Sequence, residues 1–224
     1  SVCKNKTFKS MSDIVVSRTA YRFTDLMHKN HPEAIAQLSE GHPYDVSTNI
    51  FERLPQIFFD EKPDDGNDYI RILGRMDNTR TMKFVRRDYI REVENLDGYK
   101  VLASANSNGV FGEILTPPIV AEPCVGNTET FISIGNFSSL YEADAARKYI
   151  ITKFVRALLG VLKTTHHLTP ETWKFVPQQD FSEASDIDWS RSVEEIDAFL
   201  YKKYKLTDAE ICFINEKVQA MKEV

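Results

Sequence analysis

The sequence has few cysteines and no long apolar run. Its 224 residues include three cysteines, Cys3, Cys124 and Cys212, which lie far apart and form no C-x-x-C pair. Such spacing argues against a disulfide framework and against a cysteine zinc site. No stretch approaches the ~18 uninterrupted apolar residues of a membrane helix, and the first residues lack a charged-then-apolar signal layout. We therefore expect a cytoplasmic protein that makes no contact with a membrane.

The motifs of common enzyme classes are also missing. There is no G-x-x-x-x-G-K-[ST], G-x-G-x-x-G, H-E-x-x-H or G-x-S-x-G, so nucleotide-binding, zincin and hydrolase chemistry lose support. The chain also lacks an N-P-P-Y or D-P-P-Y run, with which amino-methyltransferases hold a flipped base. His166 and His167 are adjacent and would point about 100° apart on a helix, which disfavours a shared metal. We expect no catalytic residue, metal or cofactor in this chain.

Positive charge, by contrast, is concentrated in one stretch of an acidic protein. The formal net charge is −5, yet residues 71–91 carry seven basic side chains and only two acidic ones. A solvated face is one explanation of such a stretch. The other is an anionic partner that offsets the self-repulsion, and nucleic-acid phosphate is the obvious choice. The DNA contacts predicted here are Arg71, Arg75, Arg80, Lys83, Arg86, Arg87 and Arg91.

A polar loop follows the basic stretch. The sequence SANSNGVFGE, residues 104–113, lies between two runs typical of β-strands and contains two glycines and two asparagines. It suits a simple turn, but asparagine side chains can also pair with base edges. We add Lys100, Asn106 and Asn108 to the predicted DNA contacts.

Three segments of the chain differ in their pattern. Residues 1–50 look helical or irregular, and residues 51–136 contain short β-rich runs separated by turns such as PDDGND and TPP. Residues 137–224 have helical periodicity, and their last 43 residues hold ten acidic against six basic side chains. The sequence therefore predicts an α+β fold, in which a twisted, mainly antiparallel or mixed sheet is followed by a C-terminal helical scaffold that packs on it.

Helix signals are strongest in the C-terminal segment. Apolar residues recur at helical intervals over residues 141–163, which predicts one long helix. Trp173 and Trp189 have apolar neighbours and are predicted to anchor the core rather than to stack on bases. Three pairs have the spacing of a capping box: Ser139 with Glu142, Ser192 with Glu195, and Thr207 with Glu210.

One arrangement would suit a nuclease. Asp45 precedes Asp60 and Lys62 by about fifteen residues, and Asp60 follows an apolar run. Two carboxylates and a lysine near a strand end can hold Mg²⁺ and orient a water for phosphodiester hydrolysis. Because the spacing rule is loose and the chain has 33 acidic residues, chance explains the match as well. A Mg²⁺-dependent nuclease domain remains an alternative.

The C-terminal third resembles a known family. The segments KYIITKFVRALLGVLK, WKFVPQQDF and DIDWSRSVEEIDAFLYKKYKL are similar to the C-terminal end of bacterial type II restriction-modification adenine-specific DNA methyltransferases. Looser similarity runs back through ILGR, YKVLASANSNGVFGE and PPI, so the resemblance covers residues 50–220. In these enzymes a methylase domain is followed by a target-recognition domain of the TaqI-like specificity type.

The resemblance implies a non-catalytic recognition domain. Its partners would be double-stranded DNA and a methylase domain or subunit of the same system, which would use S-adenosylmethionine and is absent from this chain. Whether the chain itself has enzymatic activity is left open by the sequence, although the parent protein would be a site-specific adenine methyltransferase. A second alternative is a protein-interaction subunit of a restriction-modification complex, which would dock through its acidic helical tail.

Overall fold

The computed structural model describes residues 2, 8–106, 110–113, 116–162 and 168–221. Its strands form one three-stranded and one four-stranded sheet, and the predicted α+β class is confirmed. The strands are β1 (Val15–Val16), β2 (Tyr69–Met76), β3 (Thr79–Arg86), β4 (Tyr99–Ser104), β5 (Ile119–Ala121), β6 (Val125–Asn127) and β7 (Phe131–Phe137). The α-helices are α1 (Asp25–Asn30), α2 (Ile50–Arg53), α3 (Leu140–Ile151), α4 (Lys153–Leu162), α5 (Val193–Lys203) and α6 (Asp208–Lys217). Short 3-10 helices lie at Met11–Ile14, Pro32–Gln37, Arg87–Tyr89 and Pro170–Trp173.

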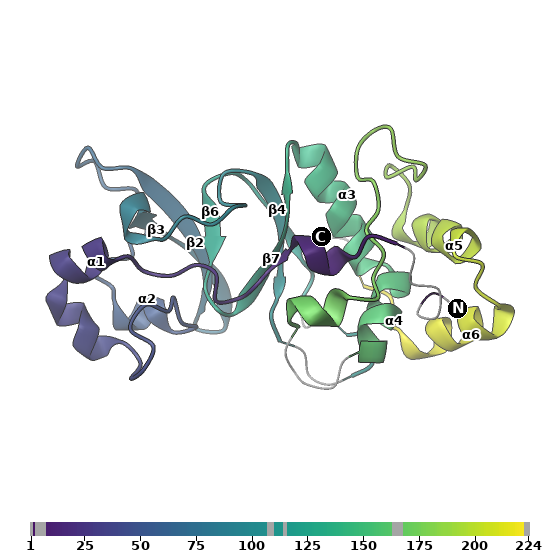
Figure 1. Cartoon of the computed structure of the whole chain (residues 1–224), viewed down its shortest axis with the longest axis horizontal. Coiled ribbons are helices and arrows are strands. Elements are labelled where there is room, and N and C mark those ends of the chain that lie inside the picture. The colour runs from purple at the N-terminus through teal and green to yellow at the C-terminus, as the bar shows by residue number, and fades with distance from the viewer. Residues whose placement is uncertain (1, 3–7, 107–109, 114–115, 163–167, 222–224) are drawn as a thin grey trace.

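The molecule is elongated and has two lobes (Figure 1). The N-terminal lobe contains α1, α2 and the three-stranded sheet, whose strand order is β3-β2-β6. The C-terminal lobe contains the four-stranded sheet, of order β1-β7-β4-β5, and helices α3 to α6. No helix in the described part of the chain is long and apolar enough to cross a membrane.

Strands β2 and β3 form a long antiparallel hairpin. Their register pairs all eight residues of each strand, from Tyr69 with Arg86 to Met76 with Thr79. Asp77 and Asn78 form the two-residue turn between them, with φ of 49° and 60°. Two successive positive φ values are the signature of a type I′ turn, which matches the right-handed twist of a hairpin. On its other edge β2 pairs in parallel with β6.

Each lobe has its own hydrophobic core. The N-terminal core is built from residues between Tyr21 and Leu96, and the C-terminal core extends to Val218. A small third cluster, made by Leu73, Leu102, Ala121, Val125 and Phe131, lies where the two sheets meet. Trp173 and Trp189 are 0% and 2% exposed, which confirms that both anchor the C-terminal core.

The prediction of one long helix over residues 141–163 is wrong. Two helices, α3 and α4, meet at Thr152, whose φ of −57° and ψ of 148° are not helical. The Thr152 hydroxyl donates to the Tyr149 carbonyl at 2.7 Å and accepts from the Val155 N–H at 3.2 Å. One threonine thus ends α3 and caps α4, although no proline or glycine marks the break.

Two of the three predicted capping boxes are complete. Ser192 with Glu195 begins α5, and Thr207 with Glu210 begins α6, each with both reciprocal hydrogen bonds. Ser139 accepts from the Glu142 N–H as predicted, but the Glu142 carboxylate turns to the N–H and hydroxyl of Ser138. The start of α3 is therefore capped by two serines rather than by one reciprocal pair.

Candidate nucleic-acid interface

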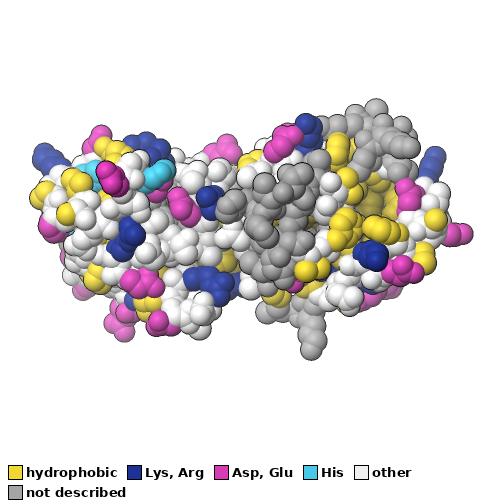
Figure 2. All heavy atoms as spheres, turned by 90° about the horizontal axis from the view of Figure 1, so that it is seen from below, with side chains coloured by type: hydrophobic (Ala, Val, Ile, Leu, Met, Phe, Trp, Pro, Cys, Tyr) yellow, Lys and Arg dark blue, Asp and Glu magenta, His cyan; other side chains and the backbone are white. Residues whose placement is uncertain are grey.

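Carboxylates pair with four of the seven basic side chains of residues 71–91 that were predicted to contact DNA. The ion pairs, with their N–O distances, are Arg71–Glu122 at 2.8 Å, Lys83–Asp60 at 2.5 Å, Arg86–Asp88 at 2.5 Å and Arg87–Asp97 at 2.6 Å. The Arg87 guanidinium donates to both Asp97 oxygens and lowers the pKa of that carboxyl. Figure 2 shows the result on one face: basic and acidic side chains are interspersed over the N-terminal lobe, without a continuous positive surface.

Lys100 lies in the interior, so the prediction that it contacts DNA is wrong. It is 0% exposed, and its Nζ donates to the carbonyls of Leu96 and Val125 at 3.1 and 3.0 Å and of Glu122 at 3.3 Å. Burial lowers the pKa of Lys100 to about 8, so at pH 7 it is still an ammonium with three donors. Three carbonyls suit those donors, and they tie β4 to the segment that leads into β6.

Replacement of Lys100 by Met tests this internal role. Lys100→Met keeps the length of the side chain but leaves buried carbonyls without their donor, which costs about 2 kcal/mol of unfolding free energy. Lys202 is exposed, and Lys202→Met makes the same chemical change with an expected effect within about 0.5 kcal/mol. Urea unfolding at pH 7 compares the two. Equal stabilities would contradict the role of the ammonium.

Arg91 belongs to another part of the surface. Its Nε donates to the Phe23 carbonyl at 3.1 Å, and its guanidinium lies 4.9 Å from the centre of the Tyr44 ring. The same ring is approached by Arg22, which pairs with Asp45 at 3.1 Å. Arg91 thus fixes the α1 region onto the lobe and does not join the other predicted contacts.

Arg75 and Arg80 are brought together by the hairpin. The register places them directly opposite each other, one residue pair from the turn. Arg75 donates to the Asn78 carbonyl at 2.8 Å, and Arg80 donates to the Thr116 hydroxyl at 2.7 Å and the Pro117 carbonyl at 2.5 Å. Both arginines line a cavity of about 370 Å³ between the hairpin and the β4–β5 connection. We call this cavity the hairpin cleft; its lining is Arg75, Asn78, Thr79, Arg80, Ser104, Thr116, Pro117, Thr130 and Phe131.

The hairpin cleft holds two positive charges, Arg75 and Arg80. Within the described residues no carboxylate pairs with Arg75 or Arg80, whereas like charges directly opposite on two strands are unfavourable. Burial, and secondarily the charge of Arg75, lower the pKa of Arg80. The Arg80 guanidinium also lies 5.9 Å from the centre of the Phe131 ring. An anion in the cleft would relieve this repulsion and find hydroxyl donors around it.

The polar loop borders the same cleft. Ser104 is its first residue and lines the cavity, and the Ser104 hydroxyl donates to the Asn106 carbonyl at 3.0 Å. Asn108 lies outside the described residues. The hydroxyl groups of Thr116 and Thr130 were not predicted, because they come from segments far apart in sequence that carry no shared motif. No signal in the sequence indicates these two threonines, because only the fold brings them to the cleft beside Arg80.

The two carboxylates of the nuclease alternative are engaged elsewhere. Asp45 pairs with Arg22 at 3.1 Å and with His42 at 2.8 Å, and Asp60 pairs with Lys83. Lys62 is exposed. In the part of the chain that the structure describes, no group of three or more His, Cys, Asp or Glu side chains is placed to hold a metal ion.

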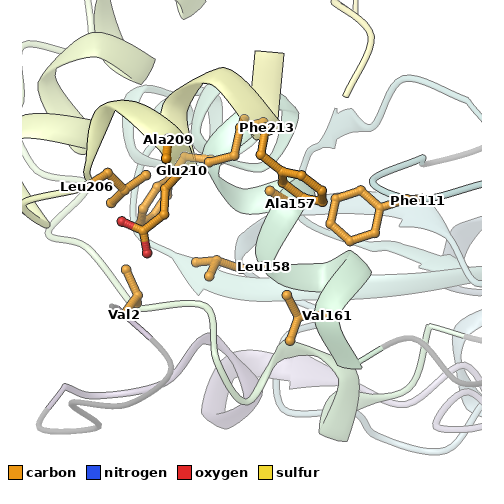
Figure 3. Close-up of a pocket in the computed structure, with 11 residues that line it drawn as sticks. Val2, Phe111, Ala157, Leu158, Val161, Leu206, Ala209, Glu210 and Phe213 are labelled. Carbon is orange, nitrogen blue, oxygen red and sulfur yellow. The ribbon is translucent and has the colours of Figure 1, made fainter. Parts of the chain in front are cut away.

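An apolar pocket lies between α4 and α6 in the C-terminal lobe (Figure 3). Its volume is about 360 Å³, and the rings of Phe111 and Phe213 meet edge-on at its rim, with centroids 5.5 Å apart. Phe213 and Val161 are 47% and 55% exposed. Glu210 is the one charged side chain among the described lining residues. The pocket is lined in part by α6, which belongs to the acidic tail through which the interaction-subunit alternative would dock, and it lacks the convergent polar groups of a catalytic site.

Comparison with protein-family models, with curated proteins and with solved structures found no match to this chain.

Proposed function

We propose that this chain binds duplex DNA as the target-recognition domain of a restriction-modification N6-adenine DNA methyltransferase. The observation that carries the proposal is the pair of guanidinium groups in the hairpin cleft, Arg75 and Arg80, which have like charge, adjacent positions and no carboxylate partner within the described residues. Phosphate would supply the missing negative charge. The resemblance of the C-terminal third to the methyltransferase family supports the same function.

In this proposal the chain positions an enzyme rather than performing the chemistry. Methyl transfer from S-adenosylmethionine would belong to a methylase domain or subunit that works together with this chain in the cytoplasm. Phosphate contacts would set the register on the duplex, and a few contacts to base edges would give specificity. The carboxylate-paired cations Arg71, Lys83, Arg86 and Arg87 would contribute less, because their charge is already compensated.

The salt dependence of binding tests the proposal. Arg75→Ala with Arg80→Ala should weaken binding to a labelled duplex of random sequence and make the slope of log affinity against log salt less steep by about 1.8, because each lost phosphate contact is worth about 0.9. Fluorescence anisotropy from about 50 to 200 mM salt measures both quantities.

The hairpin supplies a matched control. Arg71→Ala with Arg86→Ala removes the same charge from the same two strands, but from arginines already paired with Glu122 and Asp88. We expect that control to keep nearly the wild-type slope, and Arg75→Lys with Arg80→Lys to keep it as well. Equal loss of slope in the two alanine pairs would show that total charge matters and the cleft does not. An absence of duplex binding by the wild type would overturn the proposed function.

A further inference from the structure

The turn of the β2–β3 hairpin is held rigid by side chains on both sides. Arg75 donates to the Asn78 carbonyl at 2.8 Å, and the Thr79 hydroxyl donates to the Met76 carbonyl at 2.8 Å. Both bonds cross the two-residue turn formed by Asp77 and Asn78. These two hydrogen bonds stabilise the conformation of the exposed hairpin tip.

Asn78 occupies a turn position at which glycine is usually preferred. Type I′ turns prefer glycine at the second central residue, because its φ is positive. Here Asn78 has φ of 60°. Its backbone carbonyl is bound by Arg75, whereas within the described residues its side-chain amide makes no hydrogen bond. Asn78 is exposed and is one of the residues that line the hairpin cleft.

We propose that Asn78 determines sequence specificity by pairing with an adenine in the major groove, an inference that rests on the proposed function. An asparagine amide offers one donor and one acceptor side by side, which match N7 and the N6 amino group of adenine. A two-stranded β-ribbon fits into the major groove, so the hairpin can carry the amide to a base edge. Arg75 and Arg80 lie next to the tip and would contact the phosphates, and Arg75 is in addition the positioning residue of the turn.

Asn78→Gly separates recognition from folding. Glycine keeps the turn and the carbonyl that Arg75 binds, so the melting temperature should stay equal or rise. Selection of bound duplexes from a random pool, followed by sequencing, should give a motif for the wild type. In the variant one A·T position of that motif should lose its preference, which corresponds to roughly tenfold to a hundredfold less discrimination against the wrong base. The salt slope should not change, because no phosphate contact is removed.

Asp77→Gly is the matched control, since it removes the neighbouring side chain of the same turn and should leave the adenine preference in place. If Asn78→Gly keeps the complete motif, the inference is overturned, while a slope reduced by Arg75→Ala with Arg80→Ala would still support DNA binding. If Asp77→Gly abolishes the same position as Asn78→Gly, the turn shape and not the amide sets the preference, and the inference is again overturned. If the wild type selects no motif, the recognition role and this inference both fall.

Discussion

Trp173→Ala is expected to lower the free energy of unfolding by about 4 kcal/mol, the largest effect that we predict for a single substitution. The indole is 0% exposed and lies in the core of the C-terminal lobe, at the end of the 3-10 helix Pro170–Trp173. The hydrogen bond from the Ser10 hydroxyl to the backbone carbonyl of Trp173, at 3.2 Å, is kept in the alanine variant, so the expected loss comes from the indole. Urea denaturation followed by circular dichroism measures the loss.

Trp173→Phe is the control that isolates cavity formation. The Trp173 Nε1–H is buried and makes no hydrogen bond with any described residue, so phenylalanine removes volume without breaking a bond. We expect a cost of about 1 to 2 kcal/mol for phenylalanine, well below that for alanine. Equal costs for the two variants would contradict the cavity argument, because phenylalanine keeps ring volume that alanine removes. A loss below about 1 kcal/mol for alanine would contradict the packing itself.

Local signals in the sequence predicted local structure well. The capping boxes at Ser192 and Thr207 place the starts of α5 and α6, because the two reciprocal bonds involve residues only three positions apart. The runs YIRIL and MKFV lie within β2 and β3, although β2 is buried on both faces and does not show the alternation of a half-buried strand. Such elements can be predicted from residues that are close together in the sequence.

The elements that were missed depend on distant partners. Strand β6 has only three residues, Val125–Asn127, and its parallel pairing with β2 leaves no periodic pattern. Gly126 is needed there, since a Cβ would lie 2.7 Å from the Tyr21 ring and 2.8 Å from Ile72. The break between α3 and α4 was missed for a similar reason, because a side chain from α5 completes the start of α4.

The charge of the candidate site also depends on residues that are distant in sequence. The composition of residues 71–91 correctly located a basic segment, yet Arg71 pairs with Glu122, Arg87 with Asp97 and Lys83 with Asp60. A one-dimensional charge count cannot include carboxylates that only folding brings near. After those pairs are removed, the hairpin register leaves Arg75 and Arg80 as neighbours, and the register is a property of the pairing rather than of composition.

Asp197→Ala is expected to cost about 3 kcal/mol at pH 7, because it removes the side chain that caps α4 from another helix. Asp197 lies on α5 and is 6% exposed. Its two carboxylate oxygens accept from the backbone N–H groups of Lys153 and Phe154 at 2.9 and 2.8 Å. Without them, one buried and one partly buried N–H at the N-terminus of α4 lose their partner. Asp208→Ala makes the same change in the exposed first turn of α6 and should cost less than about 1 kcal/mol.

The same carboxyl should give stability a characteristic pH dependence. Burial raises the pKa of Asp197 from 3.8 to about 6, and it outweighs the two N–H bonds and the nearby charges of Arg156 and Lys153, which lower it. The folded protein therefore binds this proton more tightly than the unfolded chain does. The resulting stabilisation is complete below about pH 4 and is lost as the pH rises through about 6.

Asp197→Asn isolates this titration, since it keeps the size of the side chain and has no ionisable group. The stability of the wild type relative to Asp197→Asn should be greater at pH 4 than at pH 7, by up to about 3 kcal/mol. Urea unfolding of both proteins across this range measures the difference. A difference that grows toward pH 7 instead would mean that the two N–H bonds outweigh burial and that the folded protein prefers the ionised carboxylate.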